Sequence, residues 1–176
     1  MAVVGIILGS DSDLPKVREC FEILDQFSVD FDIIISSAHR SPEQTLDWVK
    51  GASKRGLKTI IAVAGGAAHL PGVVAAHTIL PVIGVPVETA VAGGLDSILS
   101  ILQMPSGIPV ATMSAGKSGG ANAALFAISI LAINDNSLEE KLNAYRKKME
   151  TKIIEKNKNI KEMGLMEYID KLEEKK

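Results

Sequence analysis

Cysteine is almost missing from this sequence, because Cys20 is the only one among 176 residues. A single thiol cannot close a disulfide within the chain, and such sparing use is typical of a reducing compartment. A positively charged and then apolar leader is also missing, since the apolar run Val3-Val4-Gly5-Ile6-Ile7-Leu8 begins almost at once. We therefore expect a cytoplasmic protein.

A strong excess of one charge is lacking as well. The net charge is −2, and Lys and Arg form no basic stripe. This argues against a nucleic-acid partner. With 47% hydrophobic and 23% charged residues the composition is that of a globular protein, and the length suits one compact domain.

Ionisable acids and bases are missing from the middle of the chain: no Asp, Glu, Lys or Arg lies between Thr59 and Val87. A membrane span does not explain this, because proline and glycine interrupt each apolar run before the roughly 18 residues that a span needs. In a monomer, so long an uncharged stretch would leave too apolar a surface. We therefore expect a homo-oligomer, either a dimer or a larger assembly.

Short apolar runs alternate with stretches of helical periodicity. The candidate strands are residues 3–8, 31–35, 59–63, 81–85 and 109–113, each apolar throughout, as in strands covered on both faces. The candidate helices between them are residues 14–27, 42–55, 70–77 and 95–102, and the second opens with the capping-box signature Ser41-Pro42-Glu43-Gln44. This order predicts an α/β fold with a doubly wound parallel sheet of the flavodoxin-like group.

The rest of the chain is predicted to be helical. Residues 118–133 are apolar nearly all round, so this helix should lie in the core or at a subunit interface. Beyond Asn134 charged residues dominate, and an exposed amphipathic helix is expected from Leu138 to about Lys156. We predict one catalytic domain over residues 1–157 and a charged, helical or frayed tail over residues 158–176.

Ligands of open parallel sheets bind beyond the carboxyl ends of the strands. The first strand is followed by Gly9-Ser10-Asp11-Ser12-Asp13. Its small residues would let an anion approach the backbone. Ser10, Ser12 and Asp13 either contact a ligand or cap the following helix.

The next two loops carry histidine. In Ser37-Ala38-His39-Arg40, His39 can both take and give a proton near neutral pH, and Arg40 is either a surface residue or a partner of phosphate or carboxylate. In the loop after the third strand, His69 either serves the ligand or holds the loop. His77 is expected in the core or an interface. These scattered histidines, without nearby cysteines or paired carboxylates, predict no metal site.

Two known catalytic motifs are present only in part. Gly116-Lys117-Ser118 resembles the end of a phosphate-binding P-loop, but Ala111 stands where that motif needs glycine. Serine, histidine and aspartate are present, yet the chain has no Gly-x-Ser-x-Gly nucleophile elbow. A nucleoside triphosphatase and a serine hydrolase are therefore disfavoured.

Five motifs in order resemble the catalytic subunit family of phosphoribosylaminoimidazole carboxylase, in its mutase class. They are Gly9-Ser10-Asp11-Ser12-Asp13, Ser37-Ala38-His39-Arg40, Gly65-Gly66-Ala67-Ala68-His69-Leu70-Pro71-Gly72, Gly84-Val85-Pro86-Val87 and Gln103-Met104-Pro105. The resemblance implies a flavodoxin-like three-layer sandwich, assembled as a homo-octamer with active sites at subunit junctions.

The resemblance also implies an isomerase of de novo purine biosynthesis. It would convert 5-(carboxyamino)imidazole ribonucleotide to 5-amino-1-(5-phosphoribosyl)imidazole-4-carboxylate by decarboxylation and recarboxylation, without ATP, biotin or a metal. His39 would act as both acid and base, and Arg40 would bind the phosphate. The implied substrate-binding residues are Gly9, Ser10, Ser12, Asp13, Ser37, Ala38, Arg40, Gly65, Gly66, Ala67, His69 and Leu70.

Two alternatives remain at this point. A sister class carboxylates aminoimidazole ribonucleotide directly with carbon dioxide, but its members lack the loop Gly65-Gly66-Ala67-Ala68-His69-Leu70-Pro71-Gly72 that this chain keeps. A non-catalytic nucleotide-binding module is the other, because fold does not fix function.

Overall fold

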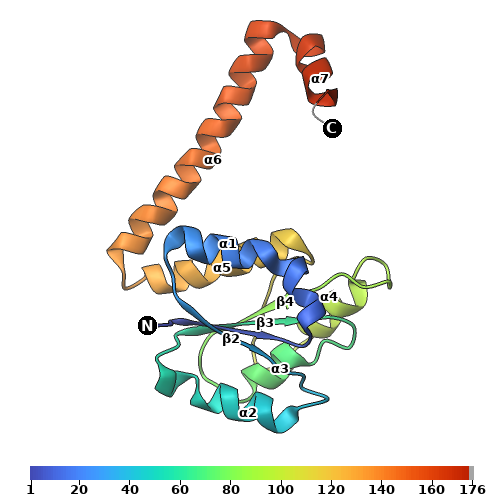
Figure 1. Ribbon diagram of the computed structural model, residues 1–176, viewed down its shortest axis with the longest axis vertical. Coiled ribbons are helices and arrows are strands. Elements are labelled where there is room, and N and C mark those ends of the chain that lie inside the picture. The colour runs from blue at the N-terminus through green and yellow to red at the C-terminus, as the bar shows by residue number, and fades with distance from the viewer. Residues whose placement is uncertain (175–176) are drawn as a thin grey trace. The chain divides into compact units, whose positions relative to one another are not determined.

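The structure is a computed structural model that describes residues 1–174 (Figure 1). The chain divides into two compact units, Met1–Asn134 and the residues from Asp135 onward. The predicted division near residue 157 between a catalytic domain and a tail stays a prediction.

The first unit is built on a parallel sheet. Its five strands in the described chain are β1 (Val4–Leu8), β2 (Phe31–Ile35), β3 (Thr59–Ala64), β4 (Val82–Pro86) and β5 (Ala111–Thr112), in the order β2-β1-β3-β4-β5. From β1 the chain crosses to β2 on one side and then back to β3 on the other, so the strand order reverses at β1. The predicted flavodoxin-like α/β fold is confirmed, and such a reversal opens a crevice at the carboxyl ends of β1 and β3.

Helices cover both faces of the sheet (Figure 1). One face carries η1 (Asp11–Val17), α1 (Arg18–Phe27) and α5 (Lys117–Ala132). The other carries α2 (Pro42–Gly51), η2 (Ser53–Arg55), α3 (Leu70–Ala75) and α4 (Leu95–Leu102), where Val49, Val74 and Ile101 join one apolar core with Ile7 and Ile60. This gives the three layers that the sequence predicted.

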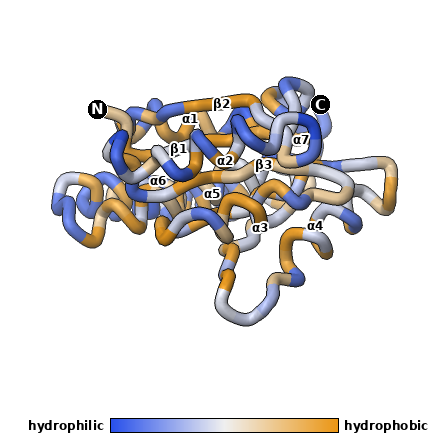
Figure 2. Tube along the Cα trace, turned by 90° about the horizontal axis from the view of Figure 1, so that it is seen from below, coloured by the Kyte–Doolittle hydropathy of each residue, from blue (hydrophilic) through white to orange (hydrophobic). Residues whose placement is uncertain are grey.

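Burial along the strands separates the centre of the sheet from its edge. All residues of β1, β3 and β4 are buried, as their continuous apolar runs predict. The prediction is wrong for β2, an edge strand that is largely hydrophobic in colour in Figure 2 but leaves Ile33 and Ile35 exposed. The strand predicted over residues 109–113 is reduced to the two residues of β5.

Several helix ends differ from their predictions. The helix expected over residues 14–27 begins as 3₁₀ helix η1, which contains Pro15. The predicted capping box is wrong, because the Ser41 hydroxyl accepts a hydrogen bond from the Ser37 amide (3.0 Å) instead of capping α2. α3 ends at Ala75, so His77 lies beyond it and is exposed rather than in the core.

Helix α5 buries only one side within a single chain. Its buried positions are small or aliphatic and include Ala123, Ala127 and Ile128, whereas Phe126 on the opposite side is 42% exposed. On α1, burial raises the pKa of the Cys20 thiol to about 12, so Cys20 remains a protonated, unreactive thiol at neutral pH.

The second unit consists of α6 (Asn136–Met163) and α7 (Leu165–Glu173). Asp135 caps α6 by accepting hydrogen bonds from the amides of Ser137 and Leu138. α6 continues past the expected end near Lys156 because Lys and Glu favour helix, and Lys158 and Glu162 lie one turn apart at 3.5 Å. Within residues 1–174 the structure contains no helix with the length and hydropathy of a membrane span.

Candidate functional site

The turn after β1 forms the first wall of the site. Ser10 is the N-cap of η1 and accepts a hydrogen bond from the Ser12 amide, while the two serine hydroxyls bond to each other at 2.8 Å. Capping, one of the two roles open for Ser10, is therefore present. Gly9 continues the sheet ladder by donating to the Val63 carbonyl (3.1 Å).

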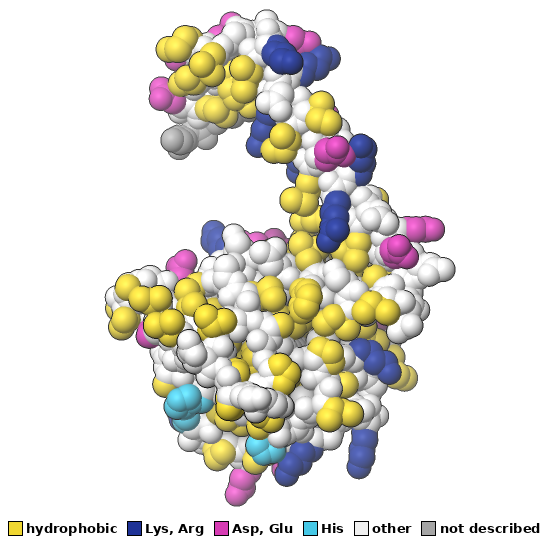
Figure 3. All heavy atoms as spheres, turned by 180° about the vertical axis from the view of Figure 1, so that it is seen from behind, with side chains coloured by type: hydrophobic (Ala, Val, Ile, Leu, Met, Phe, Trp, Pro, Cys, Tyr) yellow, Lys and Arg dark blue, Asp and Glu magenta, His cyan; other side chains and the backbone are white. Residues whose placement is uncertain are grey.

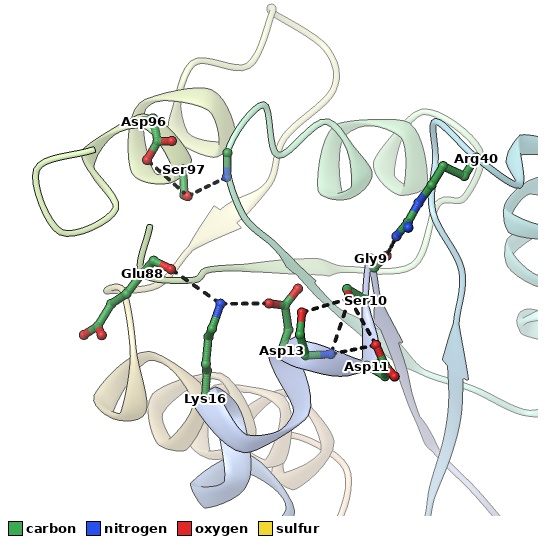
Figure 4. Close-up of polar contacts among 11 residues, drawn as sticks. Gly9, Ser10, Asp11, Asp13, Lys16, Arg40, Glu88, Asp96 and Ser97 are labelled. Carbon is green, nitrogen blue, oxygen red and sulfur yellow. Dashed lines mark hydrogen bonds and ion pairs between the residues drawn. The ribbon is translucent and has the colours of Figure 1, made fainter. Parts of the chain in front are cut away.

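Asp13 and Lys16 lie together on η1 (Figure 4). Asp13 is buried, and its carboxylate forms an ion pair with Lys16 Nζ at 3.1 Å. The same ammonium group lies 3.5 Å from the Glu88 carbonyl, so Lys16 connects η1 to the loop after β4. Lys16 was not predicted as a site residue, because a lysine three residues from an aspartate is an ordinary pair on a helix surface and the sequence does not show that Asp13 is buried.

The loop after β2 stands on a buried network of hydroxyl groups. Ser36 is 2% exposed and bonds to the hydroxyls of Thr45 (2.8 Å) and Ser41 (3.1 Å). Above this network Arg40 donates its amide to the Ser37 hydroxyl (3.2 Å) and its Nη2 to the Gly9 carbonyl (3.1 Å). Arg40 thereby joins the loops after β1 and β2, with most of its guanidinium donors left for a ligand (Figure 4).

His39 and His69 meet directly. His39 Nε2 lies 2.7 Å from His69 Nδ1, with the two rings perpendicular and their centroids 4.9 Å apart. One nitrogen must donate and the other must accept, so the contact couples the protonation states of the two rings. β1 lies between the strands that precede them, both histidines are exposed, and the small residues Gly9 and Ser10 that follow β1 line the same cavity as His39.

These groups surround a cavity of about 380 Å³ at the carboxyl ends of the strands. It is lined by Gly9, Ser10, Asp13, Lys16, Ser37, His39, Arg40, Gly65, Val87 and Thr89. With two cations beside one carboxylate, the cavity suits a small anionic ligand.

The structure brings most of the predicted site residues together. Gly9, Ser10, Asp13, Ser37, His39, Arg40 and Gly65 line the cavity, and His69 contacts His39. Ser12, Ala38, Gly66, Ala67 and Leu70 are not in its wall: Ser12 bonds to Ser10, Ala38 packs against the core, and Leu70 is buried at the start of α3. The roles of all thirteen residues stay predictions.

The loop after β4 contributes Val87 and Thr89, neither of which was predicted as a site residue, although Val87 belongs to one of the five motifs. The signal was available, because Val87 directly follows β4 and Thr89 lies two residues later, at the same edge of the sheet as the other loops. Ala115 and Gly116 of the loop after β5, with Lys117 and Ser118 at the start of α5, line a second cavity of about 460 Å³ that shares Lys16 with the first.

Metal-ligating side chains do not cluster here. Among residues 1–174, no three side chains of His, Cys, Asp or Glu gather in a way that could hold a metal ion. The expectation that the protein needs no metal or cofactor stays a prediction.

Comparison with known proteins places this geometry in a family. The family model described as AIR carboxylase matches residues 3–152. The N5-carboxyaminoimidazole ribonucleotide mutase of Pyrococcus horikoshii is 53% identical over 95% of this chain and 93% of the relative. The enzyme of the same name from Thermotoga maritima is 47% identical over 98% of this chain and the whole relative.

A solved structure shows the same fold. The crystal structure of Treponema denticola PurE superposes with a TM-score of 0.82 at 30% identity, over 92% of this chain and 99% of the other. The similarity therefore extends from the sequence to the arrangement of the sheet and its helices.

Proposed function

This chain belongs to the AIR carboxylase family, and from that membership we infer how its cavity carries out the family's chemistry. Its function is that of the mutase relatives, an isomerase reaction on 5-(carboxyamino)imidazole ribonucleotide in purine biosynthesis. The observation that supports this mechanism best is the contact of His39 with His69, 2.7 Å apart, in a cavity that also holds Arg40.

The reaction moves one carboxylate within one nucleotide. We propose that His39, as an imidazolium, protonates the exocyclic nitrogen while the bond from that nitrogen to the carboxylate carbon breaks and carbon dioxide leaves. Ring carbon 4 then attacks the retained carbon dioxide, and neutral His39 removes the proton from this carbon. The proton that was given is recovered, so no net proton is consumed.

The histidine pair fits this proton exchange. An imidazolium His39 donates from Nε2 to an unprotonated Nδ1 of His69, which is consistent with their distance. The other ring nitrogen of His39, Nδ1, then exchanges the proton with the substrate. His69 thus fixes the orientation of the acid and base group.

We propose that the polar and charged side chains of the cavity wall bind the nucleotide. Arg40 would bind the phosphate with the guanidinium donors that the Gly9 carbonyl leaves free, and Ser10 and Asp13 would contact the same ligand. Ser37, Gly65, Gly66, Ala67 and His69 would enclose the reacting end, where exclusion of water keeps carbon dioxide beside its target.

The test of the reaction separates it from direct carboxylation. Supplied with 5-(carboxyamino)imidazole ribonucleotide in bicarbonate-depleted buffer, the protein should form the 4-carboxylate isomer, measured by chromatography of the nucleotides. A direct carboxylase would instead need added bicarbonate and aminoimidazole ribonucleotide. Product formation only under the latter conditions would refute the mutase assignment.

We also propose that the protein is a cytoplasmic homo-octamer. Several apolar side chains of the first unit are exposed in a single chain, as Figure 3 shows for one face. They include Ile79, Leu95, Leu99, Leu102 and Phe126, and subunit contacts would bury them. Light scattering should then give the mass of eight chains of 18.7 kDa, and the mass of one chain would contradict the proposal.

A further inference from the structure

The loop that carries His69 is held by a helix outside the cavity wall. The loop joins β3 to α3, and Gly66 (φ 67°) and Ala68 (φ 42°) both have left-handed backbone conformations. For alanine this conformation is unfavourable and persists only where surrounding contacts hold it. The contacts that hold this loop in its conformation therefore determine the position of His69.

Two serines of α4 hold both polar groups of the Gly66 backbone. Ser97 Oγ accepts the Gly66 amide at 2.9 Å (Figure 4), and Ser100 Oγ donates to the Gly66 carbonyl at 3.4 Å. These serines lie three residues apart, so they share one side of the helix. Ser97 is fully buried, whereas Ser100 is exposed, which makes Ser97 the stronger restraint.

The Ser97 hydroxyl also takes part in a second set of hydrogen bonds, which involves Asp96 and Thr89. Its proton points to Asp96 Oδ1 at 3.4 Å, and Thr89 donates to the same oxygen at 2.6 Å. The hydrogen bond from the Thr89 hydroxyl holds the pKa of the Asp96 carboxyl below its usual value. Hydrogen bonds from Ser97 lower this pKa further, and desolvation partly offsets the effect. The carboxylate is therefore ionised at neutral pH and accepts from both neighbours.

Close packing restrains the loop from another side. A Cβ at Gly65 would lie 2.5 Å from Val87 Cγ2 and 3.5 Å from Thr89 Cγ2. The loop after β3 thus presses against the cavity wall from β4 while Ser97 holds its amide. A shift of the loop would have to break the Ser97 bond and would move His69 relative to His39.

We propose that Ser97, buried under Gly66 and linked to Thr89 through Asp96, is a positioning residue that sets His69 against His39. This rests on the proposed function, in which the histidine pair exchanges the proton. Ser97 itself is buried and is not among the residues that line the cavity, so it would act through the loop.

The decisive experiment is a double-mutant cycle between Ser97→Ala and His69→Asn. Ser97→Ala should lower kcat by about 10–100-fold, because a misplacement of about 1 Å caused by a change far from the reacting atoms can cost about 100-fold, with KM changed less than about threefold. In the His69→Asn background the same change should cost less than about threefold, because the residue through which it acts is gone. An equal loss in both backgrounds, or an unchanged kcat, would overturn the proposal.

Two further variants act as controls. Ser100→Ala removes the longer, exposed bond and should retain kcat within about threefold. Ser97→Thr keeps the hydroxyl and should restore more than half of the lost factor.

If Ser97→Ala does not fold, Asp96→Ala takes its place. This change should lower kcat by about three- to tenfold, and the loss should vanish in the His69→Asn background. A loss that persists in that background would count against the role of Ser97.

A readout independent of turnover separates this inference from the proposed reaction. In ¹⁵N spectra of the imidazoles, Ser97→Ala should shift the His69 Nδ1 resonance, and Ser100→Ala should not. If the parent protein shows no mutase turnover, the proposed function fails while this measurement still judges the positioning role. A His69 spectrum that is unchanged in Ser97→Ala would refute it.

Discussion

Replacing His39 by asparagine should lower kcat by roughly 10²–10⁴-fold, which is the contribution expected of a positioned acid and base group. Asparagine keeps a polar side chain of similar reach but has no nitrogen that titrates near neutral pH. The nucleotide should still bind, because Arg40, Ser10 and Asp13 are unchanged in the cavity wall. Steady-state kinetics, with calorimetry of product binding, would measure both effects.

A second histidine provides the matched control. His77 is exposed, contacts the Val73 carbonyl and lies outside the cavity wall. His77→Asn makes the same chemical change and should leave kcat within about twofold of the parent. If His39→Asn retained the parent rate, the one-histidine mechanism would be wrong.

Replacing Arg40 by methionine should raise KM by roughly 10–150-fold, because a charge-assisted hydrogen bond contributes about 1.5–3 kcal/mol. The aliphatic part of the side chain is retained, whereas the donors to Gly9 and to the phosphate are lost. Arg40→Lys should be intermediate, since an ammonium group restores charge without the planar set of donors. Initial rates over a range of substrate concentrations would give kcat and KM separately.

Arg55→Met is the control for this change. Arg55 pairs with Asp32 at 3.0 Å and stacks over Trp48, away from the cavity. Its loss removes one positive charge but no cavity donor, so KM should be unchanged. An Arg40→Met variant that lowers kcat alone, with KM as in the parent, would remove Arg40 from ground-state binding.

The centre of the fold was predictable because continuous apolar runs specify buried parallel strands. β1, β3 and β4 follow this rule. β2 does not, since Ile33 and Ile35 are as apolar as any central residue but lie at the sheet edge. The apolar pattern of one chain does not reveal which strand has no neighbour.

The candidate site was predictable where single residues directly follow strands, as with His39, Arg40 and Ser10. The contact between His39 and His69 was not, because it depends on the strand order that places β1 between them. Lys16 resembles an ordinary helix-surface lysine in sequence, and only the burial of Asp13 gives it a role. Ser97 likewise lies one loop and half a turn of helix beyond β4, and only the fold brings it to Gly66.

The histidine pair joins positions thirty residues apart across three parallel strands. Parallel strands cannot pair through a tight turn, so two helical crossovers must close before these rings approach each other. Contacts of such large sequence separation form slowly during folding. Enzymatic activity should consequently be among the last properties to return during refolding from denaturant, after helical circular dichroism has recovered.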